Sequence, residues 1–355
     1  MNSNTDTKPV KCVVWDLDDT VWDGVLLEDP QVRPRPEVIE VLRALDGRGI
    51  LNSIASRNDS AAALAKLAEL GIADLFLYPQ ITWGSKAQSV AAIAQRLNLA
   101  PDAFAFVDDQ AFEREEVNSR FPDVRCFDAA RAAELPSLPA FRPRFVTDES
   151  RQRRHMYRAD IERDQAAGEF AGTSEEFLAT LGMVFTIAPA QPDDLKRAEE
   201  LTVRTHQLNT TGRTYSYAEL EQLQRSEDHL LLTAELTDRF GSYGKIGLAL
   251  VELGPRAWRV KLLLMSCRVM SRGVGTVLLG EIQRLAADAG VRLQADFVVT
   301  DRNRVMYVTY RMNGFREVQR DGDEVVLEGP GGDVPPHPAH LIVRSSGRPA
   351  HAVPS

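Results

Sequence analysis

Cysteine is scarce in this chain of 355 residues, which contains only Cys12, Cys126 and Cys267. Three widely spaced thiols cannot form a disulfide framework or a zinc site, because both need clustered ligands. The chain also lacks an apolar run of about 18 residues, and residues 1–10 lack the basic and apolar segments of a signal peptide. We therefore expect a cytoplasmic protein with no membrane partner.

Basic residues are in the minority, because 42 Lys and Arg face 51 Asp and Glu, a formal net charge of −9. A protein that binds nucleic acid through its phosphates needs a basic surface, so we expect no nucleic-acid partner. Hydrophobic residues make up 44% and charged residues 26%, which allows a packed core and excludes wholesale disorder. At roughly 100–200 residues per domain, the length predicts two domains.

Residues 10–135 alternate short β-rich runs with segments of helical periodicity. This alternation predicts an α/β domain with a parallel sheet that helices cover on both faces. The expected strands are 11–16, 49–56, 74–79, 103–109 and 123–128. In sheets of this kind the ligand site lies beyond the carboxyl ends of the strands.

The rest of the chain divides by composition. Residues 136–182 begin with a proline-rich stretch and continue into a strongly charged segment, which predicts a linker followed by a helix. Residues 183–328 carry strand pairs and helices typical of an α+β domain with a largely antiparallel sheet. Residues 329–355 are rich in Pro, Gly and Ser, and we expect a disordered tail there.

Acidic residues gather at the carboxyl ends of two expected strands. Asp16 and Asp18 follow the first strand and project to the same side, because side chains alternate along a strand. Asp108 and Asp109 follow the fourth strand, and a parallel sheet brings all four to one edge. Such a group repels itself unless a cation intervenes, and its oxygens suit Mg²⁺. The alternative is a set of acidic loops at exposed strand ends.

A hydroxyl and an ammonium group reach the same edge, because Ser56 ends the second strand and Lys86 begins a helix. Together with a metal they would form a phosphate pocket in which a carboxylate can act as nucleophile. The stretch between Asp18 and Ser56 has room for one loop and one helix, so we expect no cap domain over the pocket. An uncapped pocket is open to a large, protein-borne substrate unless the second domain closes it.

Four segments carry a resemblance that spans about residues 11–135. DLDDT (16–20), the strand end at Ser56, Lys86 and FVDDQ (106–110) resemble, in order, the motifs of the haloacid dehalogenase superfamily of phosphohydrolases and phosphotransferases. The resemblance implies a Rossmann-like parallel sheet and Mg²⁺-dependent phosphoryl transfer.

The same resemblance implies roles for single residues. Asp16 would attack phosphorus and form an aspartyl phosphate, and Asp18 would protonate the leaving oxygen and then activate water. The phosphate would be held by Ser56, Arg57, Asn58 and Lys86. The Mg²⁺ ligands would be Asp16, the main-chain carbonyl of Asp18, Asp108 and Asp109. Asp109 is equally well explained as a neighbour of the ligands or as a turn former.

The segment 264–275, LMSCRVMSRGVG, leads from an expected strand into a helix. Glycines before a helix let main-chain amides approach an anionic phosphate. Four residues further along the chain add to this arrangement: Asn303, Tyr310, Gly314 and Phe315. Residues 183–320 thus resemble the acyl-coenzyme A binding core of the GNAT acyltransferases. Met270 stands where that family usually has Arg or Gln, which leaves coenzyme A binding open.

Five segments together resemble the FkbH family over nearly the whole chain: WDLDDTVWDGVLLED, ASRND, FVDDQAFEREEV, RTHQLNTTGRTYS and MSCRVMSRGVG. The resemblance implies transfer of the D-glyceryl group of 1,3-bisphosphoglycerate to the phosphopantetheine thiol of an acyl carrier protein, with dephosphorylation. The product would supply a methoxymalonyl-type extender or a glyceryl unit for polyketide biosynthesis.

Acyl loading of this kind needs a sulfur nucleophile, because attack by Asp16 on an acyl phosphate would release the carboxylate and lose its activation. Cys267 lies at an expected strand end beside Arg268 and close to a helix N-terminus, two influences that favour the thiolate. We hypothesise that Cys267 carries the glyceryl group while Asp16 removes the 3-phosphate. An inert core cysteine is the alternative.

His206 lies in a polar segment and could act as the base for Cys267 or for the carrier thiol. A structural or substrate hydrogen bond is the alternative for this histidine. Further contacts to the substrate or the pantetheine arm are expected from Gln207, Asn209, Thr210, Arg268, Arg272 and Gly273.

Residues 142–158 are rich in arginine. Carrier proteins are generally acidic, so this stretch could be a docking patch that steers association. A solvated, salt-bridged linker helix is the alternative.

Two other functions remain compatible with the sequence. The first is a Mg²⁺-dependent phosphatase acting on a small or carrier-linked phosphoester, with the C-terminal domain as a specificity module. The second is a non-enzymatic scaffold for carrier proteins.

Overall fold

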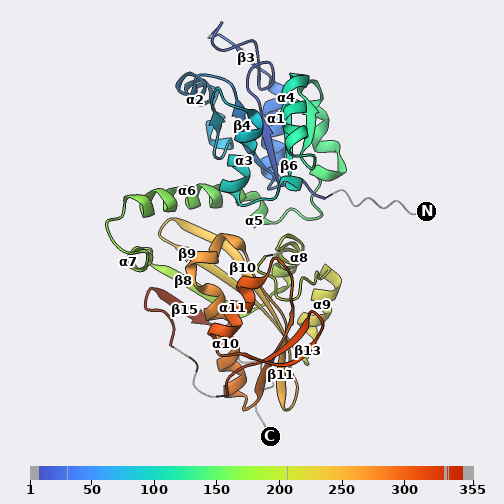
Figure 1. The fold of residues 1–355 in the computed structure, drawn as a ribbon, viewed down its shortest axis with the longest axis vertical. Helices are drawn as coiled ribbons and strands as arrows, with labels where there is room; N and C mark the ends of the chain where they lie inside the picture. Colours follow the sequence, from blue (N-terminus) through green and yellow to red (C-terminus); the bar gives the residue numbers. More distant parts are fainter. Residues whose placement is uncertain (1–7, 30, 206, 332–333, 335, 347–355) are drawn as a thin grey trace, which may run out of the picture. The chain divides into compact units, whose positions relative to one another are not determined.

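The computed structural model describes residues 8–29, 31–205, 207–331, 334 and 336–346. The chain divides into two compact units, Met1–Arg158 and Ala159–Ser355. Helix α6 (Arg153–Glu169) runs through the division, and Figure 1 follows the chain from the first unit into the second. Within the described part of the chain, no helix has the length and apolar character needed to cross a membrane.

The first unit is built on a five-stranded parallel sheet in the order β5-β4-β1-β6-β7. Its strands are β1 (Cys12–Trp15), β4 (Leu51–Ser56), β5 (Gln80–Ile81), β6 (Phe104–Asp108) and β7 (Arg125–Asp128). The central strand β1 is apolar and buried throughout, as expected for a strand that packs on both faces. The expected α/β architecture with a parallel sheet is confirmed.

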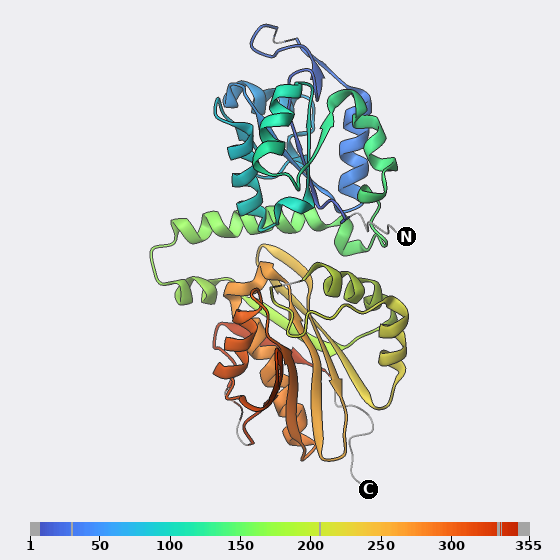
Figure 2. The ribbon, with the colours of Figure 1, turned by 45° about the vertical axis from the view of Figure 1, so that its right-hand side comes forward.

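Helices lie on both faces of this sheet (Figure 2). They are α1 (Pro36–Gly47), α2 (Ser60–Glu69), α3 (Lys86–Leu97) and α4 (Ala111–Arg120), and the short helix α5 (Asp148–Arg151) contacts α1. 3₁₀ turns lie at Ala73–Leu75, Pro101–Ala103, Ala129–Ser137 and Pro139–Phe141. Asp59 and Ser85 cap α2 and α3 by accepting main-chain N–H groups of Ala62 and Gln88. These caps set the point at which the chain turns from the sheet edge into each helix.

A small hairpin and one helix are all that separate β1 from β4. The hairpin pairs β2 (Trp22–Asp23) with β3 (Arg33–Pro34), and α1 follows it directly. The expectation that no large cap domain is inserted here is therefore confirmed. The insertion after β1 is thus a short hairpin and not a separately folded cap domain.

The second unit contains an eight-stranded mixed sheet in the order β13-β14-β12-β11-β10-β9-β8-β15. Its strands are β8 (Met183–Pro189), β9 (His229–Asp238), β10 (Gly241–Glu252), β11 (Ala257–Met265), β12 (Arg292–Val298), β13 (Arg316–Asp321), β14 (Glu324–Glu328) and β15 (Leu341–Ser345). Two pairs, β11 with β12 and β8 with β15, are parallel, and the others are antiparallel. The expected α+β domain with a largely antiparallel sheet is confirmed.

Side chains that alternate along the strands pack helices against both faces of this sheet. The helices are α7 (Ser174–Thr180), α8 (Leu195–Arg204), α9 (Tyr217–Arg225), α10 (Val274–Asp288) and α11 (Arg304–Met312), with 3₁₀ turns at Pro192–Asp194 and Cys267–Arg272. Leu263 of β11 belongs to one core with Leu278 of α10, whereas Leu264 belongs to a second core with Leu201 of α8. Adjacent residues of one strand thus hold helices to opposite faces.

Two expectations about local structure are wrong. The strand expected at 74–79 is a 3₁₀ turn, Ala73–Leu75, followed by an irregular stretch, and the edge strand of the sheet is Gln80–Ile81. The disordered tail expected from 329 contains β15, whose Leu341–Ser345 pair in parallel with β8. In both places burial of a few apolar side chains against a distant element outweighs the local pattern.

Two arginines of the arginine-rich stretch, Arg153 and Arg154, are tied into the first unit. Arg153 donates to the carbonyl of Gly49 at 2.6 Å, and Arg154 forms ion pairs with Asp46 and Asp74. Both arginine side chains are buried. Of the two explanations for this stretch, the structure favours the salt-bridged helix at these two positions.

A buried ion pair anchors α6 to the sheet of the second unit. The guanidinium of Arg163 contacts both carboxylate oxygens of Asp238 at 2.7 and 2.9 Å and lies over the ring of Tyr243. The side chains of Arg163 and Asp238 are 1% and 0% exposed. A charge left alone in such a place cannot be hydrated.

We expect Arg163→Ala to lower the free energy of unfolding by about 3–5 kcal/mol, because it leaves the Asp238 carboxylate buried and unpaired. Urea unfolding followed by circular dichroism measures the loss. The matched control is Arg151→Ala, which removes an exposed pair with Asp148 and should cost less than about 1 kcal/mol. Equal losses for the two variants would contradict the assignment.

Candidate active site

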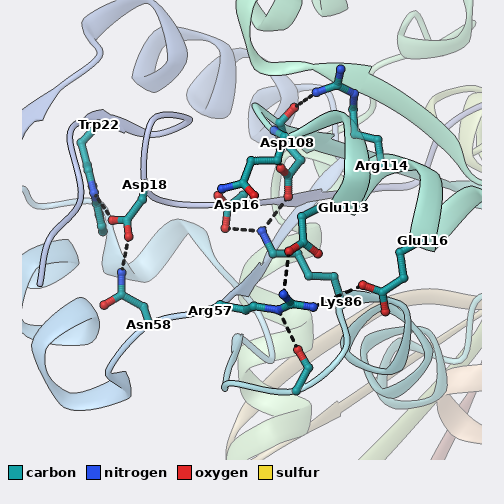
Figure 3. A network of polar contacts seen from close by, with 12 residues as sticks. Asp16, Asp18, Trp22, Arg57, Asn58, Lys86, Asp108, Glu113, Arg114 and Glu116 are labelled. Carbon is teal, nitrogen blue, oxygen red and sulfur yellow. Dashed lines mark hydrogen bonds and ion pairs between the residues drawn. The ribbon is translucent and has the colours of Figure 1, made fainter.

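Polar side chains from four strand ends meet at the carboxyl edge of the parallel sheet (Figure 3). Asp16 follows β1, Ser56 ends β4, Lys86 opens α3 after β5, and Asp108 ends β6. All four are buried, with Asp16 at 4% exposure. Contacts join them at this edge: Lys86 pairs with Asp16 and Asp108, and Ser56 hydrogen-bonds to Asp16.

The Lys86 ammonium group lies between two carboxylates. Its Nζ is 2.7 Å from Asp16 and 2.6 Å from Asp108. Burial raises the pKa of Asp16 to about 6, Lys86 works against that rise and Asp108 adds to it. Burial also acts to lower the pKa of Lys86, but the two carboxylates outweigh it and raise that pKa. Lys86 therefore stays charged and keeps Asp16 available as an anion.

Asp18 is held apart from this cluster by three donors. One carboxylate oxygen accepts from Trp22 Nε1 at 2.8 Å and from the amide of Leu26 at 3.1 Å. The other oxygen accepts from Asn58 Nδ2 at 2.9 Å. Asn58, which was expected to hold phosphate, thus orients Asp18 in this structure. Fixed donors of this kind position a carboxylate for proton transfer.

Arg57 spans the space between the β5–α3 loop and helix α4. Its Nε donates to the carbonyl of Gly84 at 3.2 Å, and its guanidinium pairs with Glu113 at 3.0 Å and Glu116 at 3.4 Å. The Arg57 side chain is 38% exposed, whereas that of Glu113 is 4% exposed. A half-exposed, fixed guanidinium at the edge of the pocket can bind an anionic group.

The carboxylates fit a hard divalent cation. Asp16, Asp108 and Asp109 each offer an oxygen, and these oxygens lie within 4.8 Å of one another. Asp109 Oδ1 is buried without a hydrogen-bond partner, and burial followed by the charge of Asp108 raises the pKa of Asp109. An orphaned carboxylate oxygen beside two others is a ligand set that suits Mg²⁺.

Three residues of α4 belong to this site although the sequence reading missed them: Glu113, Arg114 and Glu116. Arg114 donates to the main-chain carbonyl of Asp108 at 2.7 Å and pairs with Asp128. Glu113 Oε2 is buried without a hydrogen-bond partner. Their position in the helix could have predicted this placement. Residues within the first turn and a half of a helix that starts at the sheet edge can face back onto that edge.

In the second unit, Cys267 lies directly beyond β11, at the start of the 3₁₀ turn Cys267–Arg272. It is partly exposed, whereas Cys12 is buried. Gly273 adopts a left-handed conformation with φ of 72° between this turn and α10, which favours glycine at that position. The partial exposure of Cys267 favours an accessible thiol over an inert core residue.

The parallel pair of β11 and β12 separates after four residues, and the chain fills the gap itself. The two strands pair from Ala257 with Arg292 to Val260 with Ala295. Beyond this, the segment 208–210 bonds to both strands: the Met265 amide donates to the Leu208 carbonyl at 2.9 Å, and the Val298 amide donates to the Thr210 carbonyl at 3.0 Å. The segment 208–210 thus acts as a short bridging strand.

The side chains of this bridging segment are used within the protein. Asn209 accepts from the amides of Thr211 and Gly212, and the Thr210 hydroxyl accepts from the Leu263 amide. Asn303 donates to the carbonyls of Asn209, Thr210 and Val298. Both Asn209 and Thr210 are buried. Their hydrogen bonds within the protein do not support the predicted contacts with a substrate, which stay a prediction.

The remaining candidates of this unit differ in their placement. His206 lies outside the described residues, whereas Gln207 and Gly273 are exposed. Arg268 donates to the Tyr243 carbonyl at 2.6 Å. Arg272 lines a small cavity of about 190 Å³ together with residues of 167–178. Of these candidates, only Gln207 and Gly273 are exposed. Gln207 directly precedes the bridging segment in sequence, and Gly273 follows the 3₁₀ turn that begins at Cys267.

The arrangement at the first edge can bind, orient and cleave a phosphoester. A bound Mg²⁺ would supply charge neutralisation at the phosphoryl oxygens. Ser56 and Lys86 can bind those oxygens, and Lys86 holds Asp16 as an anion next to them. Asp18, fixed by Trp22 and Asn58, can hold or release a proton at its carboxylate.

We expect Asp108→Asn to weaken Mg²⁺ binding by about tenfold or more, because it removes one carboxylate charge from the cluster. Isothermal titration with MgCl₂ measures the affinity. The control Asp123→Asn changes an exposed carboxylate outside the cluster and should leave the affinity within about twofold. An unchanged affinity in the Asp108 variant would remove this residue from the ligand set.

A family model matches part of the first unit. Residues 23–113 match the family model of haloacid dehalogenase-like hydrolases. The phosphatase-domain-containing N-terminal part of the protein BF1531 from Bacteroides fragilis, solved with Mg, is 27% identical, with a TM-score of 0.35. The match covers 39% of this chain, which spans only 42% of the length of that structure. No curated protein matches the chain.

Several acetyltransferase structures are similar to part of the chain. The ribosomal-protein-S18-alanine N-acetyltransferase of Escherichia coli is 16% identical over 42% of this chain and 96% of its own length, with a TM-score of 0.34. The PaiA N-acetyltransferase of Thermoplasma acidophilum, solved with coenzyme A, is 20% identical over 41% and 98%, with a TM-score of 0.31. The N-terminal unit thus contains a region that matches the haloacid dehalogenase-like hydrolase model, and the C-terminal unit has a mixed, largely antiparallel sheet.

Proposed function

We propose that the protein is a Mg²⁺-dependent glyceryl transferase and phosphatase of the cytoplasm, acting on 1,3-bisphosphoglycerate and a phosphopantetheinylated acyl carrier protein. The carrying observation is the uncapped cluster of Asp16, Lys86 and Asp108, which is built for phosphoryl transfer. The glyceryl specificity and the carrier partner rest on the resemblance of the whole chain to the FkbH family.

The transfer half of the reaction needs a thiol, and Cys267 is the best candidate. Burial raises the pKa of Cys12, and burial raises the pKa of Cys126 to about 11, so neither thiol forms a thiolate readily. Cys267 is partly exposed and follows β11 next to Arg268. Access to solvent is one condition for a thiol to react with a soluble substrate.

The loading step balances without a further reactant. The Cys267 thiolate attacks C1 of 1,3-bisphosphoglycerate, a C–S bond forms and the C–O bond to the 1-phosphate breaks. Inorganic phosphate leaves with the bonding electrons, and the thiol proton has gone to solvent. The carrier thiol then takes the acyl group by thioester exchange, which returns Cys267 to its thiolate.

The phosphatase step uses the first unit. Asp16 attacks the 3-phosphorus, the bond from phosphorus to the glyceryl oxygen breaks, and Asp18 donates a proton to that oxygen. Water then attacks the aspartyl phosphate while Asp18 accepts its proton, releasing inorganic phosphate. The three donors to Asp18 keep its carboxylate in one place through both proton transfers.

One observation favours a second candidate, a phosphatase whose C-terminal domain only confers specificity. The bridging segment 208–210 occupies the gap between β11 and β12 and uses its own polar side chains for that purpose. An acyl group or a pantetheine arm could not extend β11 there without displacing it.

Incubation of the full chain with 1,3-bisphosphoglycerate, Mg²⁺ and a phosphopantetheinylated carrier separates the candidates when it is read by intact mass. A glyceryl adduct on the carrier supports the glyceryl transferase. Free phosphate above the non-enzymatic background without an adduct supports the phosphatase alone. If neither product forms, the non-enzymatic scaffold is the candidate that remains.

We expect Asp16→Asn to lower phosphatase activity by about 10⁴-fold or more, because the amide cannot attack phosphorus. Lys86→Ala should cost about 10²–10³-fold, comparable with the loss of one preorganised donor. Release of inorganic phosphate measures both losses. Glu69→Gln, which removes an exposed partner of Lys66 on α2, is the control. Full activity in the Asp16 variant would exclude the nucleophile assignment.

We expect Cys267→Ala to lose the glyceryl adduct on the protein while phosphatase activity on a small phosphoester persists, because the thiol and Asp16 serve different steps. Intact mass after incubation with 1,3-bisphosphoglycerate detects the adduct. Cys126→Ala is the matched control, since that thiol has a raised pKa. An adduct that survives in the Cys267 variant would reject this residue as the acyl carrier.

A further inference from the structure

Helix α7 and the end of α6 contribute to a small cavity in the second unit. Its volume is about 190 Å³, and its lining residues come from 167–178 and from Arg272. Neither Cys267 nor the segment 208–210 is among the residues that line it. The cavity is therefore separate from the thiol and from the bridging segment discussed above.

Aromatic side chains form much of the lining. Phe170 and Phe177 both line the cavity, and their ring centroids are 5.6 Å apart with the ring planes at 59° to each other. A Cβ atom on Gly172 would lie 2.6 Å from Phe170 Cε1, so the glycine allows this ring to lie close against the chain. Two rings held in this way can pack against a further apolar group, including a third ring.

Arg272 brings a positive charge to this apolar lining. Its side chain is half-buried, and its Nε atom is buried without a hydrogen-bond partner. A buried donor without a partner costs free energy, and a guanidinium that is partly withdrawn from water costs more than a neutral group. An anion bound in the cavity would offset part of this cost.

The charged groups near Arg272 favour such an anion. Arg163 pairs with Asp160 and with Asp238, each at 2.7 Å. Burial raises the pKa of Asp160, and the charges of three arginines act against this rise: Arg268, Arg163 and Arg272. Three guanidinium groups thus lie near two carboxylates, and Arg163 already engages both carboxylates. The excess of positive charge attracts a negatively charged ligand to Arg272.

We propose that this cavity binds a small organic acid that has one carboxylate and a compact aromatic or branched apolar body. The carboxylate pairs with the Arg272 guanidinium, and the apolar body packs on Phe170 and Phe177. Because Arg272 is the last residue of the 3₁₀ turn that begins at Cys267, the bound acid contacts that turn. The site lies in the second unit and does not depend on the phosphoryl chemistry of the first.

The size of the cavity limits the class of ligand. An apolar cavity of about 150 Å³ can bind benzene, so a volume of about 190 Å³ has room for one ring and a carboxylate. A nucleotide or a coenzyme is too large for this space. The ligand is therefore a small molecule that fills the cavity once.

The polar groups of the cavity also limit the charge of the ligand. The first amides of α7 are used by its own cap, since the Glu176 amide donates to the Thr173 hydroxyl at 3.2 Å and the Thr173 amide donates to the Glu176 carboxylate at 2.8 Å. The negative group of a ligand is thus bound by one guanidinium, which matches a single carboxylate.

Isothermal titration of the full chain with three probes tests the proposal. Sodium benzoate has both the ring and the charge, benzamide has the ring without the charge, and sodium acetate has the charge without the ring. We expect saturable binding of benzoate with a Kd of about 1 mM, and binding of the other two that is weaker by about tenfold or more. Equal affinity for benzoate and either of the other probes overturns the inference.

Two variants locate the site. Arg272→Gln removes the charge and Phe170→Ala removes one ring, and each should weaken benzoate binding by about tenfold or more. The matched control is Arg225→Gln, which removes an exposed guanidinium from α9 of the same unit and should leave the affinity within about twofold. Unchanged affinity in the Arg272 variant assigns benzoate to another place and rejects this site.

Thermal unfolding gives an independent readout. A ligand that binds only the folded protein raises Tm, so benzoate should raise the Tm of the unaltered protein and of the Arg225 variant but not that of the Arg272 variant. If the Arg272 variant does not fold, the Phe170 variant and the three probes still decide. Inorganic phosphate is a fourth probe, and tighter binding of phosphate than of benzoate would assign Arg272 to a phosphate group and overturn the proposal.

Discussion

The first unit depends on one electrostatic arrangement, the burial of the Lys86 ammonium group between Asp16 and Asp108. Two carboxylates from neighbouring strands could not be buried this close without a cation, because their repulsion and lost hydration have no other compensation. The same arrangement keeps Asp16 anionic despite burial. Stability of the sheet edge and readiness for attack on phosphorus therefore have a common origin.

Around this centre the surroundings divide into an inner, polar part and an outer, open part. Asp18 is immobilised by three donors, and Asp109 presents an unpartnered oxygen toward the other carboxylates. Among the described residues between β1 and α1, the inserted structure is the β2–β3 hairpin.

The second unit contains a parallel pair of strands that separates inside a mixed sheet. The main-chain groups of β11 and β12 that face each other beyond Val260 and Ala295 would be left without partners. The segment 208–210 supplies these partners, and Asn303 fastens the segment through three carbonyls. Polar residues that resembled substrate contacts in the sequence, such as Asn209 and Thr210, thus have structural roles.

The sequence by itself determined which residues reach the catalytic edge, because a strand's period of two and the start of a helix fix where Asp16, Ser56 and Lys86 project. Only the tertiary structure decided the roles of Glu113, Arg153 and the segment 208–210. Their partners are distant in sequence, so no local period encodes them. The strand β15 was not predicted for the same reason, because its partner β8 is distant in sequence and the tail around β15 has a low apolar content.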